Sequence, residues 1–308
     1  MSRKSPEPIG LTSALTAFAV SVLWGGNVVS IRVGVDSVPP LWSAFWRMLL
    51  GVVFVAAWSH RRGVSLRPAP GETAPLVALG VLFTVQIALL NSGSPLTSPA
   101  YAVVILNTYP VFANLTGHFA SRYSRWPISE EPLTPIRALG LALALAGVVW
   151  LCLDRPDRVL APRPLFGNLL MLASSILLGF RQVYTRWLVQ RVHPTRSVVW
   201  QMLLSVPLFL VVAASSEPPV YGRVTWQAIA AISYQGVIVA GICFILWAEL
   251  LRRHSAGSLS MFAFLVPICG ILLSAWIFEE TLRPTLFAGS ALVLTGVYVV
   301  VRLGRGED

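Results

Sequence analysis

The sequence predicts an all-α integral membrane protein, in which ten transmembrane helices form two five-helix repeats of opposite orientation. Three observations lead to this prediction. The composition is that of a membrane protein, the chain divides into ten long apolar runs, and its second half repeats its first. Internal repeats are sought first because a missed duplication misassigns the whole fold.

The composition excludes most soluble classes. Hydrophobic residues make up 56% of the 308 residues and charged residues only 12%, and the mean hydropathy is +0.72. Soluble domains carry about 25% charged residues. The lipid bilayer is therefore the expected environment of the chain.

Ten apolar runs are long enough, at ~20 residues each, to cross a ~30 Å hydrocarbon core as helices. The first run follows Arg3 and Lys4 and passes Ala17-Phe18-Ala19, which resembles a signal-peptide cleavage site. The run continues to Ile31, too far for a signal peptide, so we expect a retained helix. The ten runs are 11–35, 40–59, 75–93, 98–121, 135–153, 165–190, 195–214, 226–249, 256–278 and 284–302.

The duplication is clearest over the first two helices of each half. Residues 23–52 align with residues 177–206, with thirteen of thirty positions identical. Apolar composition alone would not place a proline, a tryptophan and an arginine in register. These three identities are Pro40/Pro194, Trp46/Trp200 and Arg32/Arg186.

The repeats predict the domain organisation. We expect a first repeat at 11–153, a Pro- and charge-rich linker at 154–164, and a second repeat at 165–303. Each repeat holds five helices, an odd number, so the second must be inverted relative to the first. Inverted repeats about an axis in the membrane plane are a recurring plan of secondary transporters.

The formal charge of +10 is better explained by membrane topology than by nucleic-acid binding. With both termini in the cytoplasm, cytoplasmic segments hold fifteen Lys and Arg residues and external segments six. That asymmetry fits the positive-inside rule and predicts the orientation of a chain that we expect in the bacterial inner membrane. The three cysteines show no CxxC spacing, so we expect no disulfide, metal or other cofactor.

Several motifs resemble a known family. They are Leu-Trp-Gly at 23–25, Pro40 followed by Arg47, the proline at 267, and Phe-Glu-Glu-Thr-Leu at 278–282. The chain is similar to the drug/metabolite transporter superfamily, and within it to EamA-type ten-helix exporters. This resemblance implies two helical bundles around a central cavity, and export of amino acids or related metabolites.

Charged side chains inside a membrane are costly and mark functional sites by default. Asn27 and Arg47 fall at similar depth near the outer side, and the repeat places Arg181 and Gln201 at the matching positions near the cytoplasmic side. Each pair is either a clasp that satisfies the arginine or a gate that attracts a substrate carboxylate.

Pro110 and Pro267 are expected to kink two corresponding helices near the membrane midplane. A proline within a helix leaves the carbonyl four residues earlier without its partner. Here those carbonyls belong to Leu106 and Ala263, and either a neighbouring helix or a ligand must satisfy them.

Polar and aromatic side chains around the prolines form the predicted substrate site, unless they only bond neighbouring helices. No Asp or Glu lies deep in a run, and His118 is the one deep imidazole, so we expect movement down the substrate gradient or, at most, coupling through His118. Gln235 and Ser258 are further candidates to face this site. The predicted substrate-binding residues are Gln86, Tyr101, Asn107, Tyr109, Asn114, Tyr234, Trp247 and Ser260.

We therefore expect a secondary transporter that exports small metabolites, most of all neutral or aromatic amino acids, by alternating access. Its partners would be a small-molecule substrate and the lipid bilayer, with no nucleic acid. Drugs, purines or sugars are alternative cargoes. An intramembrane enzyme would need paired acids or a nucleophile and base at membrane depth, and a scaffold would leave the duplicated polar pairs without a use.

Overall fold

A computed structural model describes residues 9–123, 134–154, 160–218, 222–254, 259, 262 and 264–303. Every regular element in this part of the chain is helical. The first half holds α1 (Leu11–Gly34), α2 (Pro40–Arg61), α3 (Thr73–Gly93), α4 (Pro99–Leu106), α5 (Tyr109–Tyr123) and α6 (Pro135–Leu153). The second half holds α7 (Pro164–Leu188), α8 (Pro194–Ser216), α9 (Trp226–Ser233), the π-helix η2 (Tyr234–Cys243), α10 (Phe244–Arg253), α12 (Leu265–Phe278), α13 (Pro284–Tyr298) and the π-helix η3 (Val299–Leu303).

Eight of the described helices are long and apolar enough to cross a membrane, and α12 is a shorter apolar helix. The eight corresponding predicted runs agree with the long helices to within a few residues, whereas α12 covers only 265–278 of the predicted run 256–278, whose first part lies largely outside the described residues. Proline occupies the first position of α2, α4, α6, α7, α8 and α13, where its fixed backbone angle suits a helix start and its missing N–H has no intrahelical partner to lose.

The predicted single helix over 98–121 is broken. It ends as α4 at Leu106, turns at Asn107 and Thr108, and restarts as α5 at Tyr109. Pro110 therefore lies in the first turn of α5, and Pro267 lies in the first turn of α12. The reason is steric, because a proline inside a helix lacks an N–H and its ring clashes with the carbonyl four residues earlier, whereas the first turn of a helix tolerates it.

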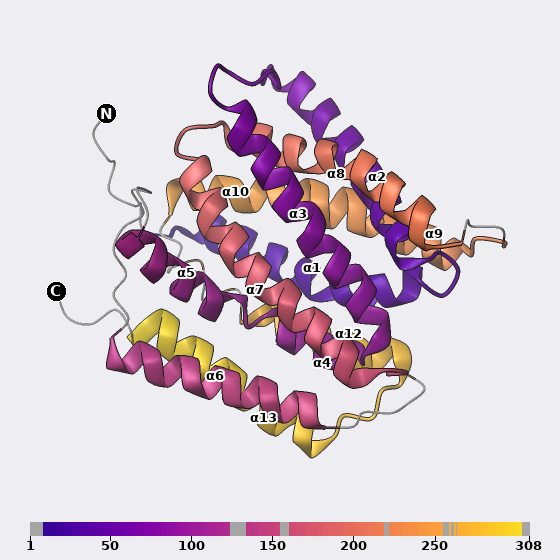
Figure 1. The fold of residues 1–308 in the computed structure, drawn as a ribbon, viewed down its shortest axis with the longest axis vertical. Coiled ribbons are helices and arrows are strands. Elements are labelled where there is room, and N and C mark those ends of the chain that lie inside the picture. Colours follow the sequence, from indigo (N-terminus) through magenta and orange to yellow (C-terminus); the bar gives the residue numbers. More distant parts are fainter. Residues whose placement is uncertain are drawn as a thin grey trace.

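Helices α6 and α13 lie side by side along one edge of the molecule (Figure 1). Glycines make this close approach possible. A Cβ on Gly296 would lie 2.4 Å from the backbone nitrogen of Ala144, and one on Gly147 would lie 2.8 Å from the carbonyl oxygen of Gly289. The spaced glycines of these two segments thus form a small-residue packing face of the kind that membrane helices use.

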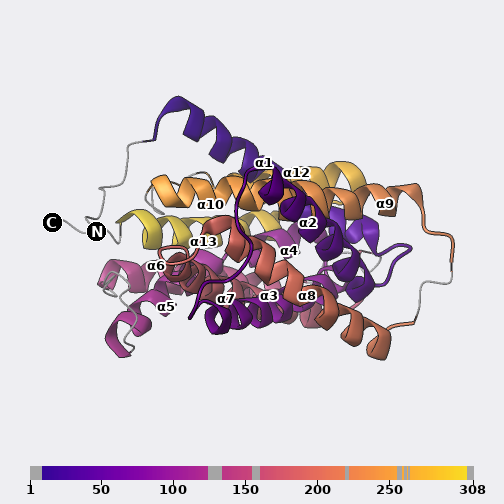
Figure 2. The ribbon, with the colours of Figure 1, turned by 90° about the horizontal axis from the view of Figure 1, so that it is seen from above.

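The remaining contacts repeat between the halves. Helix α1 packs against α12 and against α9, η2 and α10, while α7 packs against α4, α5 and α3. Helix α2 packs against α8. Figure 2 shows that the start of α1 and the end of the last helix, in yellow, lie at the same end of the bundle.

Candidate functional site

A cavity of about 110 Å³ lies among α1, α2, α3, the α4–α5 break, α7 and the η2–α10 segment. Both halves of the chain line it. Its walls combine apolar side chains such as Trp24 and Phe244 with a polar set. The polar lining residues are Asn27, Arg47, Gln86, Asn107, Tyr109, Arg181 and Gln182.

A second cavity of about 70 Å³ adjoins the first, because Trp24, Arg181, Gln182 and Phe244 line both. It follows α7 past Thr185 and Arg186 to Val189 and includes Gln201 and Trp247. Arg181 thus stands where the central cavity meets a space that runs toward the C-terminal end of α7.

The two deep arginines meet at one cavity, which differs from the prediction that they lie near opposite faces. Arg181 donates to Gln201 Oε1 at 3.4 Å, so the second predicted pair forms. Arg47 donates instead to Gln235 Oε1 at 3.4 Å, and Asn27 is its neighbour in the cavity wall.

The carbonyl that Pro110 releases is satisfied by a neighbouring helix. Ser175 of α7 donates to Leu106 O at 3.0 Å and bonds Thr108 Oγ1 at 2.9 Å. A ligand is therefore not needed there, contrary to one of the two expectations. The corresponding Ala263 lies outside the described residues.

Several predicted residues lie away from the central cavity. Tyr101 donates to Asp154, Tyr234 donates to the carbonyl of Leu23, and Asn114 donates to Pro110 O at 2.8 Å. The two tyrosine hydroxyls bond neighbouring segments, as the alternative interpretation had it, whereas the Asn114 amide bonds within its own helix, α5. Ser258 and Ser260 lie outside the described residues.

The unpredicted residues of the cavity wall include Trp24, Gln182 and Phe244. Trp24 belongs to the Leu-Trp-Gly motif and Gln182 follows Arg181, so both carried a signal that could have been used. No signal in the sequence pointed to Phe244, because the direction of its side chain depends on the π-helix before it. Among the described residues, no group of three or more His, Cys, Asp and Glu could hold a metal ion.

Comparison with known proteins follows from this geometry. The model of the EamA-like transporter family matches residues 11–153 and again residues 165–302. The chain belongs to the EamA-like transporter family. It is thus a multi-pass membrane protein of the drug/metabolite transporter superfamily.

Relatives of this EamA-like transporter match over nearly their whole length. A probable amino-acid metabolite efflux pump of Escherichia coli is 26% identical over 298 residues, covering 92% of this chain and 93% of that protein. The uncharacterized inner membrane transporter YedA of E. coli is 25% identical, with 94% and 90% covered. The uncharacterized transporter YoaV of Bacillus subtilis is 20% identical, with 92% and 95% covered. A solved crystal structure shares the fold, with a TM-score of 0.68 at 22% identity and coverage of 96% and 99%.

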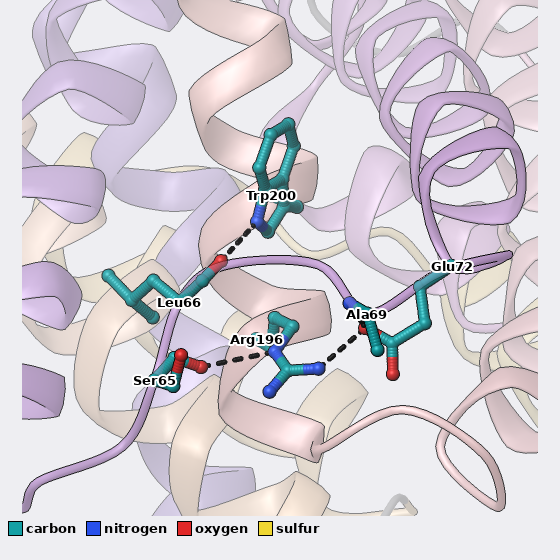
Figure 3. A network of polar contacts seen from close by, with 6 residues as sticks. All are labelled: Ser65, Leu66, Ala69, Glu72, Arg196 and Trp200. Carbon is teal, nitrogen blue, oxygen red and sulfur yellow. Dashed lines mark hydrogen bonds and ion pairs between the residues drawn. The ribbon is translucent and has the colours of Figure 1, made fainter.

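A polar network joins the two halves of this EamA-like transporter at one end of the α2–α8 pair (Figure 3). Arg196, near the start of α8, forms an ion pair with Glu72 at 2.5 Å and donates to Ser65 O at 3.1 Å. Trp200 donates to Leu66 O at 2.8 Å. The backbone N–H of Ala69 and then Arg196 hold the pKa of the Glu72 carboxyl below its ordinary value. The loop from α2 to α3 is thereby tied to the second half.

Another glutamate joins the halves at the opposite end of the same helix pair. Glu217, just after α8, accepts from the backbone N–H groups of Leu41 at 2.9 Å and Trp42 at 3.1 Å. These N–H groups are donors that the start of α2 leaves free. Burial raises the pKa of this carboxyl, and the two backbone bonds oppose that shift.

Proposed function

We propose that this EamA-like transporter exports small metabolites, amino acids among them, across the bacterial inner membrane by alternating access. One observation carries the proposal, namely the central cavity lined by side chains of both halves. A site between two similar halves can face one side and then the other as the halves rock.

The proposed architecture has ten membrane-spanning helices in two inverted repeats, at 11–153 and 165–303, joined by a linker at 154–164. The broken α4–α5 segment and the short α12 would supply the two spans beyond the eight long ones. The repeated packing of α1 and α7 supports the inverted arrangement. So does the twofold match of one family model.

We place both termini in the cytoplasm. The excess of basic residues in the segments assigned to that side supports this orientation. The shared position of the two described chain ends supports an even number of crossings.

Amino acids are the first substrate class to test because the E. coli relative is named as a probable amino-acid metabolite efflux pump. Drugs, purines and sugars remain the alternative cargoes. Purified protein in liposomes should release labelled amino acids faster than protein-free liposomes do. Leu145→Ala, on the exposed face of α6, serves as the control variant and should transport like the parent. If the liposomes release purines or sugars but no amino acids, the proposed substrate class is wrong. If they release no amino acid, drug, purine or sugar, the proposed function is contradicted.

A further inference from the structure

The charge of the central cavity restricts its substrate. Arg47 is 1% exposed and Arg181 is 9% exposed, and both line the same cavity. Two buried like charges at membrane depth are costly unless an anion accompanies them.

Neutral groups only partly satisfy these arginines. Each guanidinium has five donors, yet each makes one bond, at 3.4 Å, to a glutamine oxygen. The Nε atoms of Arg47 and Arg181 are buried without a hydrogen-bond partner. Arg181 also lies over the Phe83 ring at 4.8 Å, a contact that leaves its donors free.

No carboxylate of the described chain lines the cavity. Glu280 and Asp154 are engaged elsewhere: Glu280 accepts from Ser274 at 2.5 Å and from Ser98, and Asp154 accepts from Tyr101. The described acidic residues lie in loops or near helix ends and are Asp36, Glu72, Asp154, Glu217, Glu249, Glu279 and Glu280.

The cavity also offers acceptors. The side-chain oxygens of Asn27 and Gln86 are buried without a partner, and Gln86 Nε2 already donates to Ser174 Oγ at 2.8 Å. Such oxygens can accept from an ammonium or hydroxyl group of a bound molecule. The lining therefore suits a molecule with anionic groups at the arginines and a donor beside the amides.

We infer that the substrate is a small organic acid with two carboxylates, an acidic amino acid or a simple dicarboxylate, with its anionic groups shared between Arg47 and Arg181. This inference rests on the proposed function and narrows its substrate class. A neutral amino acid brings one carboxylate and would leave the second arginine unmatched. Of the predicted tyrosines Tyr109 lines the central cavity and Tyr101 and Tyr234 do not, and Trp24 and Phe244 complete its aromatic surface.

Glutamate and glutamine provide the sharpest comparison, because they differ in charge and hardly in shape. Liposomes that contain the purified protein are loaded with one unlabelled compound, and uptake of the same labelled compound by exchange is measured. Glutamate should exchange at least ~10-fold faster than glutamine at limiting concentration, since bonds to charged groups are the stronger ones. Succinate measures the contribution of the amino group, which the oxygens of Asn27 and Gln86 would accept.

Variants of the two arginines test whether these residues cause the preference for glutamate over glutamine. Arg47→Gln and Arg181→Gln should each bring the glutamate-to-glutamine ratio toward one, and Arg47→Lys and Arg181→Lys should retain part of it. Arg62→Gln is the matched control, because Arg62 is exposed at the end of α2 and stacks on Trp58 at 4.9 Å. If the glutamine variants do not fold, the parent protein and the lysine variants still provide the comparison.

The outcomes separate the two proposals. Exchange of glutamine or leucine as fast as glutamate and succinate would overturn the inference and leave the export function standing. A glutamate preference unchanged in both arginine variants would also overturn it. Failure of every compound in the panel would remove the proposed function and this inference with it.

Discussion

Two asparagines allow a matched test of the cavity at the scale of single residues. Asn107 and Asn114 each donate to the carbonyl four residues earlier, at 2.8 Å in both cases, but only Asn107 lines the central cavity. We expect Asn107→Ala to weaken the apparent substrate affinity ~10-fold, because a bond to a charged group is worth ~1.5–3 kcal/mol. Asn114→Ala should leave it within twofold. Equal effects in concentration-dependent uptake would place the site elsewhere.

The ion pair of Glu72 and Arg196 predicts a pH dependence. Because the pKa of Glu72 is lowered in the folded protein, its stabilisation is present above the ordinary carboxyl pKa and is lost as pH falls through the lowered value. Glu72→Gln should therefore lower the unfolding midpoint in detergent at pH 7, and the difference from the parent should vanish in acid.

The control for that experiment is Glu249→Gln. Glu249 pairs with Arg253 on an exposed helix face, where the side chains are 36% and 57% exposed, against 14% and 15% for Glu72 and Arg196. Exposed pairs of this kind contribute only ~0.3–0.5 kcal/mol. A larger effect at Glu249 than at Glu72 would show that the Glu72 network contributes little to stability.

Residue-level prediction from the sequence is most direct where a residue type has few uses in lipid. Arg47 and Arg181 were identified because a buried charge is rarely accidental. Tyr101, Tyr234 and Asn114 were assigned to the site on polarity alone. In the structure the two tyrosines bond neighbouring segments and Asn114 bonds a carbonyl of its own helix. Polarity does not say which way a side chain points, since that depends on the rotation of each helix about its axis.

At the scale of elements, the α6–α13 contact can be tested with two glycines. An added Cβ at Gly296 would lie 2.4 Å from the nitrogen of Ala144 and 2.5 Å from the oxygen of Gly140, both backbone atoms that cannot rotate away. Gly296→Ala should cost ~1–3 kcal/mol of stability through overpacking. Gly117→Ala meets no neighbouring atom within 4 Å and should be neutral, or stabilising by up to ~1 kcal/mol. Unfolding midpoints that fall equally would contradict this account of the packing.

The helices were predicted well and their irregularities were not. The length of an apolar run predicts the length of its helix, because a helix needs ~20 residues to cross a ~30 Å hydrocarbon core. The break at Asn107 and Thr108 depends on Ser175 of another helix, which satisfies the exposed carbonyl. The π-helix η2 likewise places Gln235 beside Arg47. Both features depend on partners far away in sequence, so the spacing of apolar residues along the chain does not predict them.

At the scale of the whole molecule, two loop arginines test the topology. Arg67, between α2 and α3, and Arg223, between α8 and α9, are both exposed. In a chain whose three native cysteines are replaced, Arg67→Cys and Arg223→Cys should react with a membrane-impermeant thiol reagent from opposite sides. Arg223→Cys should react in intact cells and Arg67→Cys only after lysis. Labelling of both from one side would exclude the inverted arrangement.

The unmatched positive charge of the cavity has a consequence for the energetics of the cell. Export of an anion is electrogenic, and a cytoplasm held at negative voltage drives it at ~2.3 kcal/mol per charge per 100 mV. For two charges this is ~4.6 kcal/mol, a concentration ratio on the order of a thousandfold. Such a carrier needs no proton and no deep carboxylate, because the membrane potential itself performs the work. A potassium diffusion potential set by valinomycin should accelerate succinate efflux when the inside is negative and slow it when the sign is reversed. Efflux insensitive to voltage would mean that a compensating ion travels with the substrate.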